Sequence, residues 1–194
     1  MKIARYSAPN PQGKGLTGLL PDWEDTRPRG AIAKSSPQLL ADYFTSMLVL
    51  SAAFKFKPVV GRDYYLYWMN DRWSLSLIGP SEWGADRSQA CVGKCVLHAD
   101  MTWTISPSVK LGECEPAMKA IAGFHDAFVE RLRSDAPLEH KLPGYVAELP
   151  YYQRLFASAL SRSLKSSMTL GGQLSIKSRD WLEKGGQVFF PGAS

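Results

Sequence analysis

The chain is poor in histidine and cysteine and has no long apolar run. Only three of its 194 residues are His and three are Cys, and none cluster at metal-ligand spacing, so we expect no metal and no cofactor. The longest apolar run, MLVLSAAF at 47–54, is far too short to cross a bilayer. Residues 1–15 carry charges and prolines but no apolar core of a secretory signal. We therefore expect a cytoplasmic protein.

Motifs of known chemistry are also missing. The sequence has no H-E-x-x-H, no G-x-S-x-G and no phosphate-binding glycine loop. The polar residues near the predicted sheet are Asp63, Glu82, His98 and Asp100, and their spacing fits no catalytic mechanism. Glu82 is expected to cap a short helical turn or to bind a backbone amide. An enzyme is therefore the weakest of the function classes considered.

The odd number of cysteines fits a reducing compartment. Cys91 and Cys95 fall in one predicted strand. A spacing of four residues places both on one face, about 13 Å apart at ~3.3 Å per residue, which is too far for a disulfide. We expect free thiols.

Charge is distributed unevenly along the chain. Residues 1–62 hold nine Lys and Arg against four Asp and Glu, whereas residues 63–115 hold four against seven. Residues 1–35 are rich in Pro and Gly and are predicted to be an irregular basic arm. Residues 36–194 are predicted to be a single domain. The possible anchors of the arm on that domain are Leu19, Leu20 and Trp23.

Apolar residues at helical spacing predict three main helices. Ser36 and Pro37 mark the start of a helix that runs to about Ala53. Two further helices are expected over 115–135 and 148–167. A turn of helix is expected to begin at Ser178.

Four strands are predicted between the first and second helices, over 64–69, 72–78, 92–97 and 101–106. Asn70-Asp71 reads as a two-residue hairpin turn that pairs Trp68 with Trp73. A three-residue loop at 98–100 would pair Leu97 with Met101. The fold class that follows is α+β, with a small antiparallel meander of about four strands packed against three or so helices.

The hairpin register sends the rings to two faces of the sheet. The apolar face holds Tyr64, Leu66, Trp68, Trp73, Leu75 and Leu77. The opposite face combines two large rings with hydroxyls and one lysine, and we call it the tyrosine face. It consists of Tyr65, Tyr67, Ser74, Ser76, Lys94, Thr102 and Thr104. Such a face is wet, covered by a polar element, or used for recognition.

The signature YYLY…SLI-x-P-x-EWG…D-x-TW resembles an uncharacterised domain-of-unknown-function family (2452). The resemblance covers about residues 57–105 and includes Gly61, Tyr64, Leu66, Pro80, Glu82, Trp83, Gly84, Asp100 and Trp103. It implies no established activity, ligand or catalytic residue.

Two binding functions remain. The first is a non-catalytic protein- or peptide-interaction module that uses the tyrosine face. The alternative is a nucleic-acid-binding protein that stacks bases on Tyr65 and Tyr67, with Arg62, Arg72 and Lys94 nearby. The acidic net charge of 63–115 favours the first. No membrane partner is expected, and the oligomeric state is not predicted.

Overall fold

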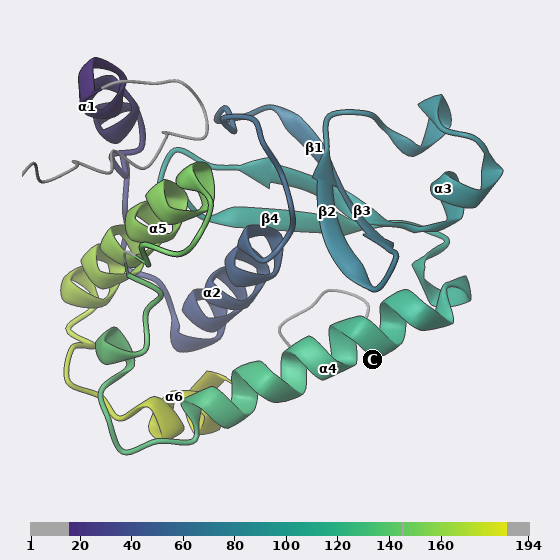
Figure 1. The fold of residues 1–194 in the computed structure, drawn as a ribbon. Coiled ribbons are helices and arrows are strands. Elements are labelled where there is room, and N and C mark those ends of the chain that lie inside the picture. The colour runs from purple at the N-terminus through teal and green to yellow at the C-terminus, as the bar shows by residue number, and fades with distance from the viewer. Residues whose placement is uncertain (1–15, 145, 186–194) are drawn as a thin grey trace, which may run out of the picture.

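A computed structural model describes residues 16–144 and 146–185 (Figure 1). One four-stranded antiparallel sheet packs against helices, so the α+β class is confirmed. The strands are β1 (Asp63–Met69), β2 (Arg72–Ser76), β3 (Cys91–Leu97) and β4 (Trp103–Pro107). The α-helices are α1 (Leu16–Asp25), α2 (Ser36–Leu50), α3 (Ala85–Gln89), α4 (Glu115–Leu132), α5 (Tyr151–Leu170) and α6 (Ser178–Gly185). Single 3₁₀ turns are η1 (Pro80–Glu82), η2 (Leu111–Glu113) and η3 (Leu138–His140).

The strand order is β2-β1-β3-β4, so the expected meander is corrected. β1 lies between β2 and β3, and the chain returns from β2 through η1 and α3 to the other edge of β1 (Figure 1). The outer edge of β2 is already occupied. The backbone N–H of Ala53 donates to the carbonyl of Trp73 at 2.9 Å, and the Leu75 N–H donates to the carbonyl of Ala53 at 3.1 Å.

The predicted hairpin register is confirmed. Trp68 pairs with Trp73 across a two-residue turn. Asn70 and Asp71 have φ values of 52° and 53°, which is the geometry of a type I′ turn. The prediction for Leu77 is wrong, because β2 ends at Ser76 and the Leu77 side chain is 41% exposed.

The turn between β3 and β4 is two residues longer than predicted. Leu97 pairs with Trp103 rather than with Met101. The carboxylate of Asp100 accepts hydrogen bonds from the N–H of Thr102 at 3.1 Å and from its hydroxyl at 2.6 Å, which closes the longer turn. A shift of two residues keeps every side chain on its face, so Leu97 and Trp103 remain in the core.

A β-bulge places the two strand cysteines on opposite faces, and the prediction of one shared face is wrong. Cys95 pairs with Tyr64 on the core side, whereas Cys91 pairs with Tyr67 on the other side. The register shifts between Leu66 and Tyr67, and an extra residue in one strand reverses the alternation beyond it. All three cysteines are free thiols.

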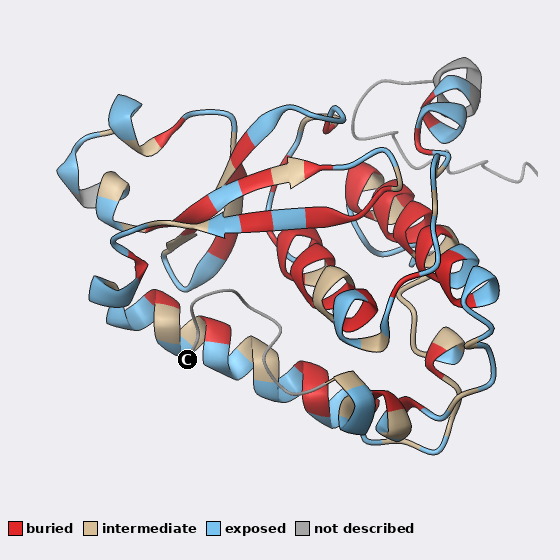
Figure 2. Ribbon diagram, turned by 180° about the vertical axis from the view of Figure 1, so that it is seen from behind, coloured by how far each residue is buried: buried red, intermediate tan, exposed pale blue. Residues whose placement is uncertain are grey.

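Helix α2 lies at the centre of the fold, in contact with α4, α5, α6 and β4 (Figure 1). Its N-cap is Ser35, one residue before the predicted cap, because the Ser35 hydroxyl accepts the N–H of Gln38. Helices α2 and α5 are buried on several sides, whereas α4 buries one stripe (Figure 2). The core therefore lies between the sheet and these three helices.

The predicted irregular arm contains a helix, α1, that lies beside α5 (Figure 1). Tyr151 of α5 donates a hydrogen bond to Asp22 at 3.0 Å, and the guanidinium of Arg162 lies 4.7 Å from the ring centre of Trp23. Trp23 is therefore a contact between arm and body, as predicted. The side chains of Leu19 and Leu20 lie outside the described residues.

Candidate binding site

The half of the tyrosine face that β1 and β2 form is largely covered. The Tyr67 ring is 1% exposed, and its hydroxyl donates to the carbonyl of Ile78 at 2.9 Å. Burial raises the pKa of this phenol above its ordinary value. Tyr65 is half-buried with its ring against Gly79, and the Ser76 hydroxyl accepts the Ile78 N–H at 3.0 Å. Residues 78–79 thus lie against both rings.

The half that β3 and β4 form is exposed, but its polar side chains already have partners within the protein. Lys94 is exposed and lies 3.3 Å from the carboxylate of Asp63. Thr104 is exposed and bonds the His98 imidazole at 2.8 Å. Thr102 is buried in the β3–β4 turn and does not lie on this face. The structure therefore brings Tyr65, Ser74, Lys94 and Thr104 onto one side without a continuous exposed tyrosine surface.

The outer strands offer little free backbone for an added strand. At the β4 edge, the N–H of Trp103 donates to Ser46 at 2.9 Å, and its carbonyl accepts from Thr45 at 2.8 Å. Pro107 has no N–H to offer. The β2 edge is bound to Ala53. Pairing with a partner's strand is thus hindered at Trp103 and Pro107 of β4 and at Trp73 and Leu75 of β2.

Residues that carry the family resemblance hold loops in place. The N–H of Gly61, at φ 78°, donates to the Leu97 carbonyl at 2.9 Å. The hydroxyl of Tyr64 accepts the N–H of Val59 at 2.7 Å. Glu82 accepts the N–H of Gly79 at 3.0 Å, which is the backbone-binding role expected for it. Gly61 and Tyr64 therefore fix the loop 57–61 against the sheet.

Lys34 joins three distant segments through a buried ion cluster. Its ammonium lies 2.6 Å from Asp42 of α2 and 2.7 Å from Asp100 of the β3–β4 turn, and its side chain is 6% exposed. Burial alone would lower the pKa of Lys34, but the hydrogen bonds that its ammonium donates to both carboxylates raise it. Burial raises the pKa of Asp42, whereas hydrogen bonds from Lys34 and Thr102 lower that of Asp100 despite burial. Charged Lys34 is therefore a structural anchor.

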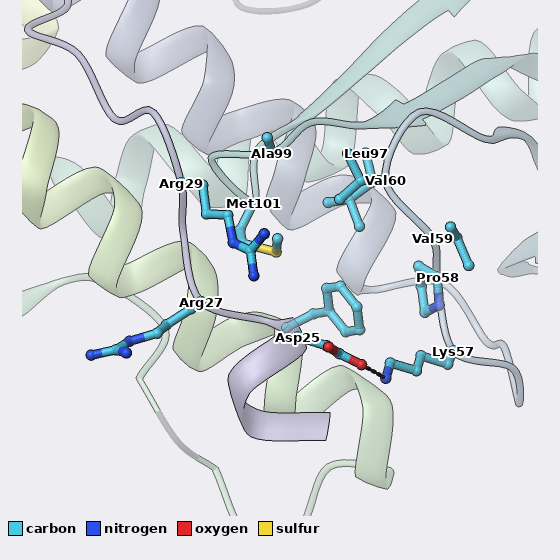
Figure 3. A pocket seen from close by; sticks show the side chains of 11 residues that line it. Asp25, Arg27, Arg29, Lys57, Pro58, Val59, Val60, Leu97, Ala99 and Met101 are labelled. Atoms are coloured by element: carbon cyan, nitrogen blue, oxygen red, sulfur yellow. Dashed lines mark hydrogen bonds and ion pairs between the residues drawn. The ribbon is translucent and has the colours of Figure 1, made fainter. Parts of the chain in front are cut away.

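Beside this cluster lies a cavity of about 420 Å³, which we call the Arg29 cavity (Figure 3). Its walls come from the end of α1 and the segment after it, from the loop 57–60, from the β3–β4 turn and from α5. The cavity is within the roughly 300–1,000 Å³ of typical ligand sites. Its apolar lining is Pro58, Val59, Val60, Leu97, Ala99, Met101 and Phe156, and its charged lining is Asp25, Arg27, Arg29 and Lys57.

The cations of the Arg29 cavity differ in their partners. Lys57 lies 2.8 Å from Asp22 and 2.8 Å from Asp25. Arg27 points away from the cavity in Figure 3 and lies 3.4 Å from Glu24. The guanidinium of Arg29 points into the cavity beside Met101 (Figure 3), and within the described residues it forms no ion pair or hydrogen bond. The site can therefore accept one anionic group.

Met101 holds a left-handed backbone conformation at the floor of the cavity. Its φ is 67° and its side chain is 3% exposed. This conformation costs a non-glycine residue about 1–2 kcal/mol and often occurs at ligand sites. The N–H of Met101 donates to the carbonyl of His98 at 2.9 Å, which holds the turn.

A second hollow of about 440 Å³ adjoins the first and shares Arg29 and Ala99 with it. His98, Asp100 and Thr104 line this hollow. No group of three or more His, Cys, Asp or Glu in the described part of the chain could hold a metal ion. Among the described helices, none is long and apolar enough to span a membrane.

Sequence reasoning missed Arg29, Val60, Met101 and Phe156 as members of one site. They come from four segments that no local motif connects, and the left-handed Met101 has no sequence signal because the expected turn ended before it. The only hint was the segment KPVVG, which begins the stretch that resembles the family.

Comparisons with known proteins inform the family alone. No curated protein and no solved structure matches the chain. One family model matches, from the segment before α2 through the whole sheet into α4, so it includes the Lys34 cluster and most of the Arg29 cavity. The resemblance is therefore confirmed: residues 31–122 match the family described as Protein of unknown function (DUF2452).

Proposed function

We propose that this protein is a non-catalytic module that binds a peptide segment of a partner protein, and that the Arg29 cavity is its binding site. The observation that supports the proposal is the cavity itself, which has an apolar floor and one cation, Arg29, whose guanidinium has no partner among the described residues. At its mouth Val59 and Val60 are 52% and 44% exposed. Apolar groups left in water around a hollow are typical of interaction sites.

The tyrosine face has less support as the contact surface. Tyr67 is buried and bonded to Ile78, so it could contact a partner only if residues 78–79 moved away. The blocked edges of β2 and β4 also disfavour recognition by strand addition. A cavity that receives side chains of the partner needs neither.

A nucleic-acid function has less support, because several basic groups are already neutralised. Lys34, Lys57 and Lys94 each lie within 3.3 Å of an Asp carboxylate. Salt-dependent binding to phosphates requires cations that are free to release counterions. Catalysis has the least support, since Lys34 and Asp100 neutralise each other.

The proposal is tested by selecting binders from a random peptide library displayed on phage. The affinities of the selected peptides are then measured for the parent protein, Val60→Asp and Val109→Asp. Val60 lines the cavity, whereas Val109 is 99% exposed and does not line it. We expect Val60→Asp to weaken binding at least about tenfold and Val109→Asp to leave it unchanged. Equal affinity for both variants, or no binders from the library, would refute the proposal.

We further propose that the protein functions in the cytoplasm. All three cysteines are free, and Cys91 and Cys95 are buried, as is usual in a reducing compartment. Fractionation of the source cells, with the protein detected by an antibody, tests this, and recovery outside the cytoplasm would contradict it.

A further inference from the structure

Resting on the proposed function, we infer that the bound segment carries a carboxylate beside a bulky apolar side chain. The carboxylate binds the Arg29 guanidinium, and the apolar side chain enters the cavity against Val60, Leu97 and Met101.

The charges of the lining select an anion and assign it to one residue. Lys57 is held between two carboxylates at 2.8 Å, and Arg27 turns away toward Glu24 (Figure 3). Among the cations that line the cavity, Arg29 alone points inward, and its guanidinium has no partner among the described residues. Arg29 is exposed at the mouth, and a neutral ligand that covers it would remove water from the guanidinium without giving it an acceptor, which is costly. A carboxylate can accept two parallel N–H bonds from it.

The backbone around Arg29 is held in position before any ligand arrives. The N–H of Arg29 donates to the carbonyl of Ala99 at 2.8 Å, which ties the segment to the β3–β4 turn. Lys34 then bonds Asp100 of the same turn at 2.7 Å. Fixing the segment at two points reduces the entropy that binding must remove. Only the side chain of Arg29 remains to be ordered by the anion.

The apolar part of the ligand follows from the floor of the cavity. Leu97 and Met101 are buried beneath it, and Phe156 of α5 is 2% exposed beside it. The volume of about 420 Å³ admits a Leu or Phe side chain together with adjoining backbone. An acidic residue next to that side chain brings its carboxylate to the mouth, where Arg29 lies.

Two synthetic peptide sets test the inference. One set contains hexapeptides with a central Leu or Phe flanked by Glu or Asp, and the other replaces each acid by its amide, Gln or Asn. Affinities are measured by fluorescence anisotropy for the parent, Arg29→Gln and Arg72→Gln. Arg72 is an exposed arginine of β2 that does not line the Arg29 cavity, so Arg72→Gln is the matched control.

We expect the acidic set to bind the parent and Arg72→Gln at least about tenfold more tightly than the amide set, because charge-assisted bonds are worth about a factor of ten or more. In Arg29→Gln this preference should disappear. Equal binding of both sets to the parent overturns the inference, yet leaves the proposed function standing if Val60→Asp still weakens that binding. The inference is also overturned if neither peptide set binds, or if free decanoate binds while no peptide does.

Discussion

The ammonium of Lys34 lies 2.7 Å from the carboxylate of Asp100, across 66 positions of the chain. This contact fixes the β3–β4 turn to the segment that carries Arg29. We predict that Asp100→Asn lowers the free energy of unfolding by about 3 kcal/mol, because it leaves a buried cation short of one anionic partner. Urea denaturation measures the loss.

The matched control for that change is Asp63→Asn. Asp63 also pairs with a lysine, Lys94, at 3.3 Å, but both side chains are about half exposed. Exposed pairs contribute about 1 kcal/mol or less, so Asp63→Asn should change stability little. If both variants lose equal stability, the Lys34 cluster is not an anchor.

The same cluster predicts a dependence on pH. The pKa of Asp100 is lowered in the folded state, so its contribution is complete above the unfolded value of about 3.9 and is lost as pH falls through the folded value. The stability difference between the parent and Asp100→Asn should therefore be constant from about pH 5 to 7 and shrink below about pH 4. Asp42, whose pKa is raised, titrates in both proteins, so its own contribution largely cancels in this difference. A difference that grows in acid would contradict this assignment.

Gly93 is predicted to tolerate no side chain. A Cβ on Gly93 would lie 2.5 Å from the backbone oxygen of Ser106 and 3.1 Å from the Cα of Pro107. Gly93→Ala should therefore cost at least about 2 kcal/mol, since the neighbouring strand must move. Gly123 of α4 is exposed with nothing within 4 Å, so Gly123→Ala should stabilise by about 0.5–1 kcal/mol. Thermal melts of both variants test this, and a Gly93→Ala variant as stable as the parent would contradict the β3–β4 pairing.

Tyr67 is predicted to be structural. Tyr67→Ala should destabilise by about 3 kcal/mol because it empties a buried ring site, and Tyr67→Phe by about 1 kcal/mol through loss of the bond to Ile78. Tyr65→Ala should cost less, since that ring is only half-buried. A Tyr67→Ala variant that melts like the parent would restore the tyrosine face as an exposed recognition surface.

The thiols should differ in reactivity. Cys91 and Cys95 are buried, and burial raises the pKa of both, whereas Cys114 is partly exposed. A disulfide reagent such as DTNB should modify one thiol rapidly in the folded protein and all three in denaturant. Rapid modification of two or three thiols would contradict the burial of the β3 cysteines.

Local patterns predicted much of the fold. The Asn70-Asp71 turn and the alternating rings around it specify the hairpin, and the apolar spacing in 115–135 and 148–167 specifies α4 and α5. Strand order was not predictable in this way, because it depends on Ala53 occupying the edge of β2. The bulge in β3 also leaves no local signal, yet it reverses the face of Cys91.

The candidate site was largely beyond sequence reasoning. Tyr67 obeys the predicted alternation, but its exposure is decided by residues 78–79, which fold back over it. The Arg29 cavity exists because Asp22 and Asp25 bind Lys57 and because Lys34 binds Asp100. Each of these contacts joins residues more than 30 positions apart, where no pattern of spacing applies.

The central claim is that the Arg29 cavity, and not the tyrosine face, contacts the partner. The direct measurement is a titration of the ¹⁵N-labelled protein with a selected peptide, followed by the shifts of backbone amide signals. We expect the largest shifts at residues 25–30, 57–61 and 97–101, whose segments line the cavity. Shifts confined to Tyr65, Lys94, Thr104 and their strand neighbours would contradict the claim and place the contact on the sheet.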